Sequence, residues 1–85
     1  MAKYEKILTL ILSGSSDSKI PFEKLRSLLK NLGFDERVRW SHHIFTKAGV
    51  EEILNLQPKG NLSKPYQVKQ VRSVIVKYKL GQSYE

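Results

Sequence analysis

The sequence predicts an α+β fold in which two helices precede three antiparallel strands and a final helix. Apolar side chains recur every three to four residues between 21 and 33, which indicates an amphipathic helix. β-Branched and aromatic residues are frequent in 37–56, which favours strands. A proline and a glycine bound the segment 65–81, as is typical of a helix. With 85 residues, the chain is expected to form a single domain.

The two N-terminal helices are predicted from the spacing of their apolar residues. The first covers 4–12 and ends at a run of small polar residues, 13–18. The second opens near Pro21 and closes at Gly33, because glycine suits a left-handed helix cap. The apolar residues expected to face the core are Tyr4, Ile7, Leu8, Ile11, Leu12, Phe22, Leu25, Leu28, Leu29 and Leu32.

The middle of the chain predicts a small antiparallel sheet. The three expected strands are 37–40, 42–45 and 51–56. Ser41 is the pivot between the first two, and 47–50 resembles a hairpin turn. The segment 58–61 is expected to break the third strand.

The last segment, 65–80, carries signals for both helix and strand. Its valines and isoleucine favour a strand, because β-branched side chains lose rotamer freedom in a helix. Pro65 at the first turn, Gly81 just beyond the end and a length of about four turns favour a helix, which we therefore predict. The residues of its apolar face are Val68, Val71, Val74, Ile75 and Tyr78. Arg72 and Lys79 lie at one edge of that face, with Lys69 nearby, and form a basic rim.

Composition favours a cytoplasmic protein. The chain has no cysteine, which excludes disulfides and thiolate metal sites and suits a reducing compartment. Its longest apolar run, 7–12, is too short to span a membrane or to form a convincing signal-peptide core, so no membrane association is expected.

The net charge of +7 is unevenly distributed. No carboxylate occurs between Ile53 and Tyr84, whereas six lysines and arginines do. A third of a chain that carries only positive charges attracts phosphate backbones or an acidic protein. Such a stretch is also typical of a solvated surface.

Both histidines lie together in Ser41-His42-His43. Histidine can accept and donate protons near neutral pH, and RNA carries its own nucleophile in the 2′-hydroxyl. Neighbouring strand residues point to opposite faces, so His42 and His43 are not expected to act as a close pair or to bind zinc. Cations near His42, such as Arg39 or Lys47, would favour its neutral, proton-accepting form.

Several segments share their order and spacing with one family of small proteins. They are Pro21-Phe22-Glu23-Lys24-Leu25, Leu32-Gly33-Phe34, Ser41-His42-His43-Ile44-Phe45, Asn55-Leu56-Gln57-Pro58 and Lys64-Pro65-Tyr66-Gln67-Val68-Lys69-Gln70-Val71. From Gly14 onward the chain thus resembles the HicA toxins of type II toxin–antitoxin systems, which cleave messenger RNA and are neutralised by HicB antitoxins. The resemblance implies an α-β-β-β-α fold like that of the double-stranded-RNA-binding domain. Residues 14–81 would form this core, and 1–13 an accessory helix.

The resemblance also implies roles for individual residues. His42, directly after the serine, would be the catalytic acid or base, and His43 would pack or hydrogen-bond within the fold. The expected partners are messenger RNA and a HicB-like antitoxin, and cleavage would need no metal or cofactor. The family usually has glycine before the serine, where this chain has Trp40. Tryptophan is expected to block an unusual backbone angle there, although its ring could stack on an unpaired base.

The candidate RNA contacts are Trp40, Ser41, Lys64, Lys69 and Arg72. Trp40 could equally fill the core, and the three basic residues could be solvated. Tyr66 and Gln67 are expected to open the last helix, where they either cap it or present backbone N–H groups to phosphate. Two other classes of function stay open: a non-catalytic RNA-binding module of the same fold, and a module that binds only an acidic protein.

Overall fold

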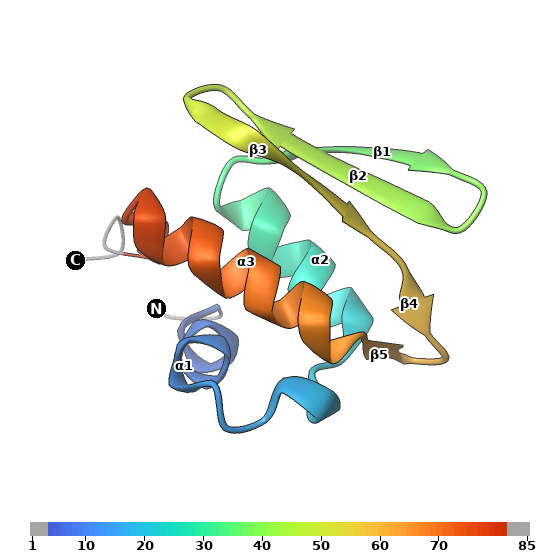
Figure 1. The fold of residues 1–85 in the computed structure, drawn as a ribbon, viewed down its shortest axis with the longest axis vertical. Coiled ribbons are helices and arrows are strands. Elements are labelled where there is room, and N and C mark those ends of the chain that lie inside the picture. The colour runs from blue at the N-terminus through green and yellow to red at the C-terminus, as the bar shows by residue number, and fades with distance from the viewer. Residues whose placement is uncertain (1–3, 82–85) are drawn as a thin grey trace.

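The structure, a computed structural model, describes residues 4–81. These residues form three α-helices, a short 3₁₀ helix, a three-stranded sheet and a two-stranded hairpin (Figure 1). In chain order the elements are α1 (Glu5–Ser13), η1 (Asp17–Lys19), α2 (Phe22–Asn31), β1 (Asp35–Arg39), β2 (His42–Lys47), β3 (Val50–Leu56), β4 (Pro58–Lys59), β5 (Leu62–Ser63) and α3 (Pro65–Lys77). The predicted α+β class and the three-stranded antiparallel sheet are confirmed.

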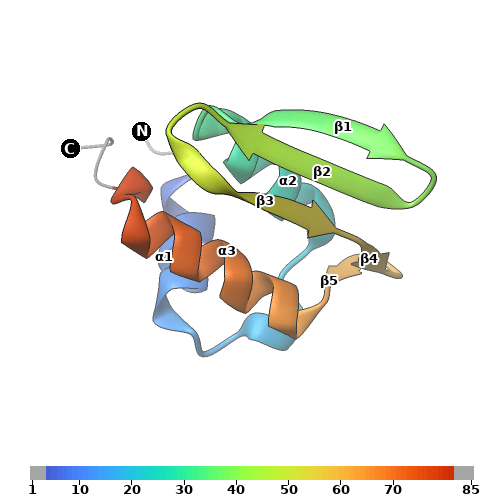
Figure 2. The same cartoon turned by 45° about the horizontal axis from the view of Figure 1, so that its top comes forward.

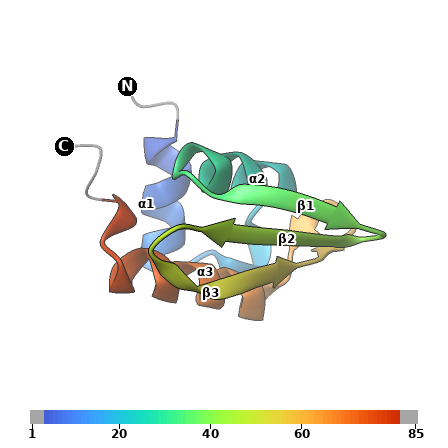
Figure 3. The ribbon, with the colours of Figure 1, turned by 90° about the horizontal axis from the view of Figure 1, so that it is seen from above.

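The main sheet has the strand order β1-β2-β3. Arg39 pairs with His42 between β1 and β2, and Ile44 pairs with Asn55 between β2 and β3. Helices α2 and α3 cover one face of this sheet, and α1 packs against both helices on the side away from it (Figure 1). Seen from above, the sheet lies in front of the helices (Figure 3). No element of residues 4–81 covers its other side, which we call the open face.

The core lies between the sheet and the helices. Phe45, Leu54 and Leu56 point from the sheet toward the helices and are buried, as strand alternation requires. The predicted apolar faces of α2 and α3 are buried too, apart from Tyr78, which is partly exposed. The prediction is wrong for Leu12, which is 40% exposed because it lies on the outer side of α1.

Glycine ends α1 and α2 as expected from its freedom at positive φ. Gly33 has φ 102° just after α2, and the N–H of Phe34 reaches back to the carbonyl of Leu29 at 3.0 Å. Helix α3 ends at Lys77, before the predicted end at residue 80, and Lys79 adopts a left-handed φ of 56°.

The segment after β3 differs from the prediction of a simple break. Pro58–Lys59 pairs with Leu62–Ser63 to form a small hairpin, with Gly60 in its turn at φ 63°. Figure 2 shows this hairpin between the end of β3 and the start of α3. Leu62 also bridges to Pro21, which ties the hairpin to the start of α2. No helix within residues 4–81 is long and apolar enough to cross a membrane.

Candidate functional site

His42 is the first residue of β2 and lies on the open face. Its neighbour His43 contacts α2, so the side chain of His42 points away from the helices. The Nδ1 atom of His42 lies 3.1 Å from Oδ1 of Asn55 on β3. Because an amide oxygen only accepts, this contact places a proton on Nδ1 and leaves a lone pair on Nε2. No other described side chain hydrogen-bonds to His42, so Nε2 is available to accept a proton.

Two side-chain hydrogen bonds link the β1–β2 turn beside His42 to Gln57 and Lys64. Gln57 Nε2 donates to Ser41 Oγ at 2.8 Å, and Lys64 Nζ donates to Gln57 Oε1 at 3.3 Å. These bonds connect the turn, the end of β3 and the residue before α3. They hold the ammonium group of Lys64 at the same end of the sheet as His42.

Gln67 supports this arrangement from inside the fold. Its side chain is buried, its Oε1 accepts from the N–H of Gln57 at 3.0 Å, and its Nε2 donates to the carbonyl of Asn55 at 3.2 Å. Helix α3 therefore fixes the backbone of the strand that carries Asn55. Sequence reasoning considered Gln67 only as a residue that opens the last helix and missed this role. The available signal was an amide next to Val68 on an apolar helix face.

Trp40 does not fill the core, because it is 89% exposed. Arg39 lies over its ring, with Cζ 5.8 Å from the ring centroid. The expectation that tryptophan blocks an unusual backbone angle is wrong, since Trp40 itself has φ 56°. The reason is the turn: Arg39 pairs with His42, so Trp40 and Ser41 form a two-residue hairpin loop, and such loops need a positive φ at the first central residue.

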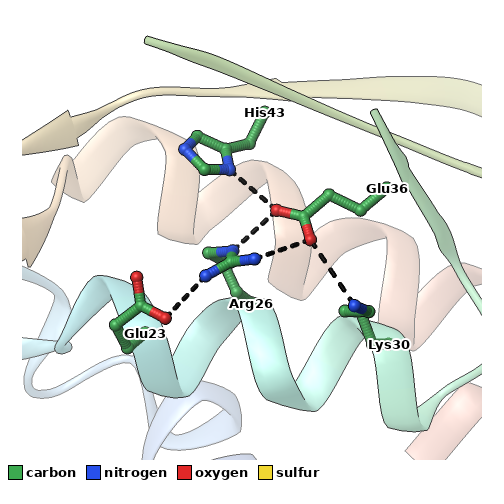
Figure 4. Close-up of polar contacts among 5 residues, drawn as sticks. All are labelled: Glu23, Arg26, Lys30, Glu36 and His43. Carbon is green, nitrogen blue, oxygen red and sulfur yellow. Dashed lines mark hydrogen bonds and ion pairs between the residues drawn. The ribbon is translucent and has the colours of Figure 1, made fainter. Parts of the chain in front are cut away.

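His43 has a structural role, as predicted. Its ring packs edge-on against Phe22 at a centroid distance of 4.9 Å, and its Nδ1 donates to Glu36 Oε2 at 2.7 Å (Figure 4). Glu36 also binds Arg26 through both carboxylate oxygens, at 2.6 and 2.8 Å. These hydrogen bonds, first from Arg26 and then from His43, lower the pKa of Glu36 to about 2 against the cost of burial. The network joins β1, β2 and α2 on the inner side of the sheet.

The structure separates the three predicted basic RNA contacts. Lys64 is linked to Ser41 through the side chain of Gln57, as described above. Lys69 is exposed and lies close enough to Asp17 of η1 to help lower the pKa of that carboxyl. Arg72 binds both oxygens of Asp17, at 2.9 and 3.0 Å, and donates to the carbonyl of Ile11 at 3.0 Å. Its guanidinium therefore fastens α1 and η1 to α3 and is already paired with a carboxylate.

Lys47 does not meet the expectation that it acts on His42. It is the last residue of the six-residue strand β2 and His42 is the first, so the two lie at opposite ends of the strand. Arg39 directly opposes His42 in the pairing of β1 with β2.

The residues around His42 lie on the exposed sheet surface and the adjoining turn. A hollow elsewhere, between α1 and α2, is lined by Tyr4, Ile7, Leu10, Pro21 and Lys24, and none of the residues around His42 contributes to it. Residues 4–81 contain no cluster of three or more histidine or acidic side chains that could hold a metal ion. An open surface gives a long polymer unhindered access.

Comparisons of this chain with models of known protein families, with curated protein sequences and with solved structures found no match.

Proposed function

We propose that this protein is an RNA-cleaving toxin of the HicA type, with His42 as its acid/base residue. The observation that carries the proposal is the contact between His42 Nδ1 and Asn55, which leaves Nε2 as a proton acceptor on an exposed surface. The succession α2-β1-β2-β3-α3 supports the arrangement of the double-stranded-RNA-binding domain, with α1 as an addition. Messenger RNA in the cytoplasm would be the substrate.

The chemistry needs one base, one acid and positive charge. Nε2 of His42 takes the proton of a 2′-hydroxyl, and the 2′ oxygen forms a bond to the adjacent phosphorus. The bond from phosphorus to the 5′ oxygen breaks, and that oxygen takes a proton from water or from the ammonium group of Lys64. The products are a 2′,3′-cyclic phosphate and a 5′-hydroxyl end. Arg39 and Lys64 stabilise the extra negative charge on the phosphate oxygens.

Trp40 is compatible with this proposal. Glycine in the family would provide a positive φ, and Trp40 adopts a positive φ in this chain, so the turn that presents Ser41 and His42 is kept. The proposed protein partner is a HicB-like antitoxin, which would cover the basic surface with acidic groups. A neighbouring reading frame for such a protein in the genome would support this partner.

The test is cleavage of RNA by purified wild-type protein and by His42→Ala. His42 makes one surface hydrogen bond, so its removal should leave the fold intact. The wild type should produce cyclic phosphate ends in the presence of a chelator, and His42→Ala should be about 100-fold slower or worse. Lys24→Ala, an exposed change on α2, is the control and should cleave normally. Intact RNA with the wild type, or equal cleavage by His42→Ala, would contradict the proposal.

A non-catalytic RNA-binding module is the alternative. It is favoured by one observation: no second proton carrier among the described residues hydrogen-bonds to His42, and His43 points to the other side of the sheet. This alternative predicts salt-sensitive RNA binding without cleavage.

A further inference from the structure

The open face of the sheet has a composition that the cleavage site alone does not explain. Strand register and alternation place five residues on this face near the β1–β2 turn: Arg37 and Arg39 of β1, His42 and Ile44 of β2, and Asn55 of β3. Toward the other end of the strands the same face carries Asp35, its pairing partner Thr46, and Ile53. Arg37, Ile44 and Asn55 form one row across the three strands, and Arg39 and His42 form the next.

Charge is polarised along this face. Arg37 and Arg39 are exposed, and neither forms an ion pair with another described residue. The acidic residues Asp35 and Glu51 lie at the opposite end of the same strands. A polyanion is therefore attracted to the end of the face that carries His42.

Apolar groups on the same face indicate which form of polyanion fits. Ile53 is 65% exposed, and Trp40 at the adjoining turn is 89% exposed. A double helix offers phosphates and groove edges but hides the flat faces of its bases, whereas an unpaired strand offers phosphates and base faces together. A surface that combines unpaired arginines with an exposed indole and an exposed isoleucine is complementary to the unpaired strand.

We infer that the open face of the sheet binds single-stranded RNA, with phosphates on Arg37 and Arg39, one base stacked on Trp40 and another on Ile53. This surface rests on the proposed function only in placing the scissile phosphate beside His42; binding itself does not require cleavage. Trp40 and Ile53 are then the residues that determine the preference for unpaired RNA.

The test uses the His42→Ala protein, so that RNA is bound without being cut. A labelled strand of about twelve nucleotides, alone or annealed to its complement, is titrated by fluorescence anisotropy at several salt concentrations. The single strand should bind at least about tenfold more tightly than the duplex, and it should quench the fluorescence of Trp40, the only tryptophan.

Variants locate the surface. In the same His42→Ala background, Arg39→Ala should weaken single-strand binding about tenfold. It should also reduce the slope of log affinity against log salt concentration by about one, because one phosphate contact is lost. Ile53→Glu should weaken it by a similar factor, and Ile53→Ser is a milder second variant if the fold is disturbed. The matched controls are Lys24→Ala on α2 and Leu12→Glu on α1, which remove a cation or add an acid on the helix side and should bind normally.

The outcomes separate the two proposals. Equal or tighter binding of the duplex, or equal losses in the control variants, would overturn the inference whether or not the wild type cleaves RNA. Tight single-strand binding by His42→Ala together with an inactive wild type would overturn the cleavage proposal and leave this surface supported.

Discussion

Asn55 accepts a hydrogen bond from Nδ1 of His42 at 3.1 Å, across the pairing of β2 and β3. Gln67 holds the backbone on both sides of Leu56, so the position of Asn55 also depends on α3. The imidazole is thus oriented by a neighbouring strand and, through that strand, by a helix. The proton-accepting atom of the proposed base is determined by this contact.

Asn55→Asp should change the pH dependence of cleavage. A carboxylate in contact with Nδ1 stabilises the protonated imidazole, and a base must be neutral to act. The acid limb of the pH–rate profile should therefore move up by about one pH unit. The measurement is the rate at saturating RNA across the pH range. Thr46→Asp adds the same charge at the other end of β2, and an equal shift in that variant would refute the role of the contact.

Glu36 should make stability dependent on pH in the acid range. Its pKa is about 2 in the folded protein and 4.5 in the unfolded chain, chiefly because Arg26 hydrogen-bonds to the carboxylate. A lowered folded-state pKa stabilises the protein above about pH 4.5, and this contribution is lost as the pH falls toward 2. Glu36→Gln should lower the free energy of unfolding by about 2–3 kcal/mol near neutral pH. Urea denaturation should show this difference shrinking toward zero in acid.

Glu52 provides a control for the effect of burial. Its pKa is also about 2, mainly because Lys77 and then Tyr78 hydrogen-bond to it, but this pair is at the surface. Water and salt screen such a pair. Glu52→Gln should therefore change stability less than Glu36→Gln and lose its effect in high salt. Equal and salt-insensitive effects would show that burial of Glu36 is not the cause.

Arg72 should contribute to stability and not to RNA binding. It joins α3 to Asp17 and to the carbonyl of Ile11 in the last turn of α1, so Arg72→Ala should lower the free energy of unfolding by about 1–3 kcal/mol. The RNA affinity of the folded Arg72→Ala protein should equal that of the protein with Arg72, when concentrations are corrected for the unfolded fraction. Lys69→Ala, one turn earlier on the same helix, is the matched loss of charge and should lower the melting temperature much less, because Lys69 acts on Asp17 only at a distance. Weaker RNA binding by Arg72→Ala without loss of stability would restore its predicted role as an RNA contact.

Local signals in the sequence were sufficient for the three α-helices and the three-stranded sheet, but not for η1, the β4–β5 hairpin or the contacts around His42. Apolar spacing together with Pro21, Gly33 and Pro65 located two helices, because these signals act within a few residues. The pairing of Arg72 with Asp17 joins residues 55 positions apart, which no local pattern encodes.

The contact of His42 with Asn55 depends on strand register, which follows from the burial of Phe45, Leu54 and Leu56 in three dimensions. The divergence of His42 and His43 was predictable, because it needs only the two-residue period of a strand. The conformation of Trp40 was not, because a two-residue loop imposed a positive φ on a side chain that disfavours it.

Trp40 should therefore lower the stability of the fold while it strengthens the binding of RNA. Its φ of 56° costs a residue other than glycine about 1–2 kcal/mol. Trp40→Gly relieves this strain, and after the entropy cost of glycine the free energy of unfolding should rise by about 0.5–1 kcal/mol.

Trp40→Ala keeps the β-carbon and the strain, so it should show no such gain in urea denaturation. Both variants lose the indole, and each should bind single-stranded RNA about tenfold more weakly than the wild-type turn in the His42→Ala background. Trp40→Phe keeps an aromatic ring and should retain most of the affinity without gaining stability. If Trp40→Gly is less stable than Trp40→Ala, the turn is not strained by tryptophan. If Trp40→Ala binds RNA as tightly as Trp40→Phe, the ring does not stack on a base.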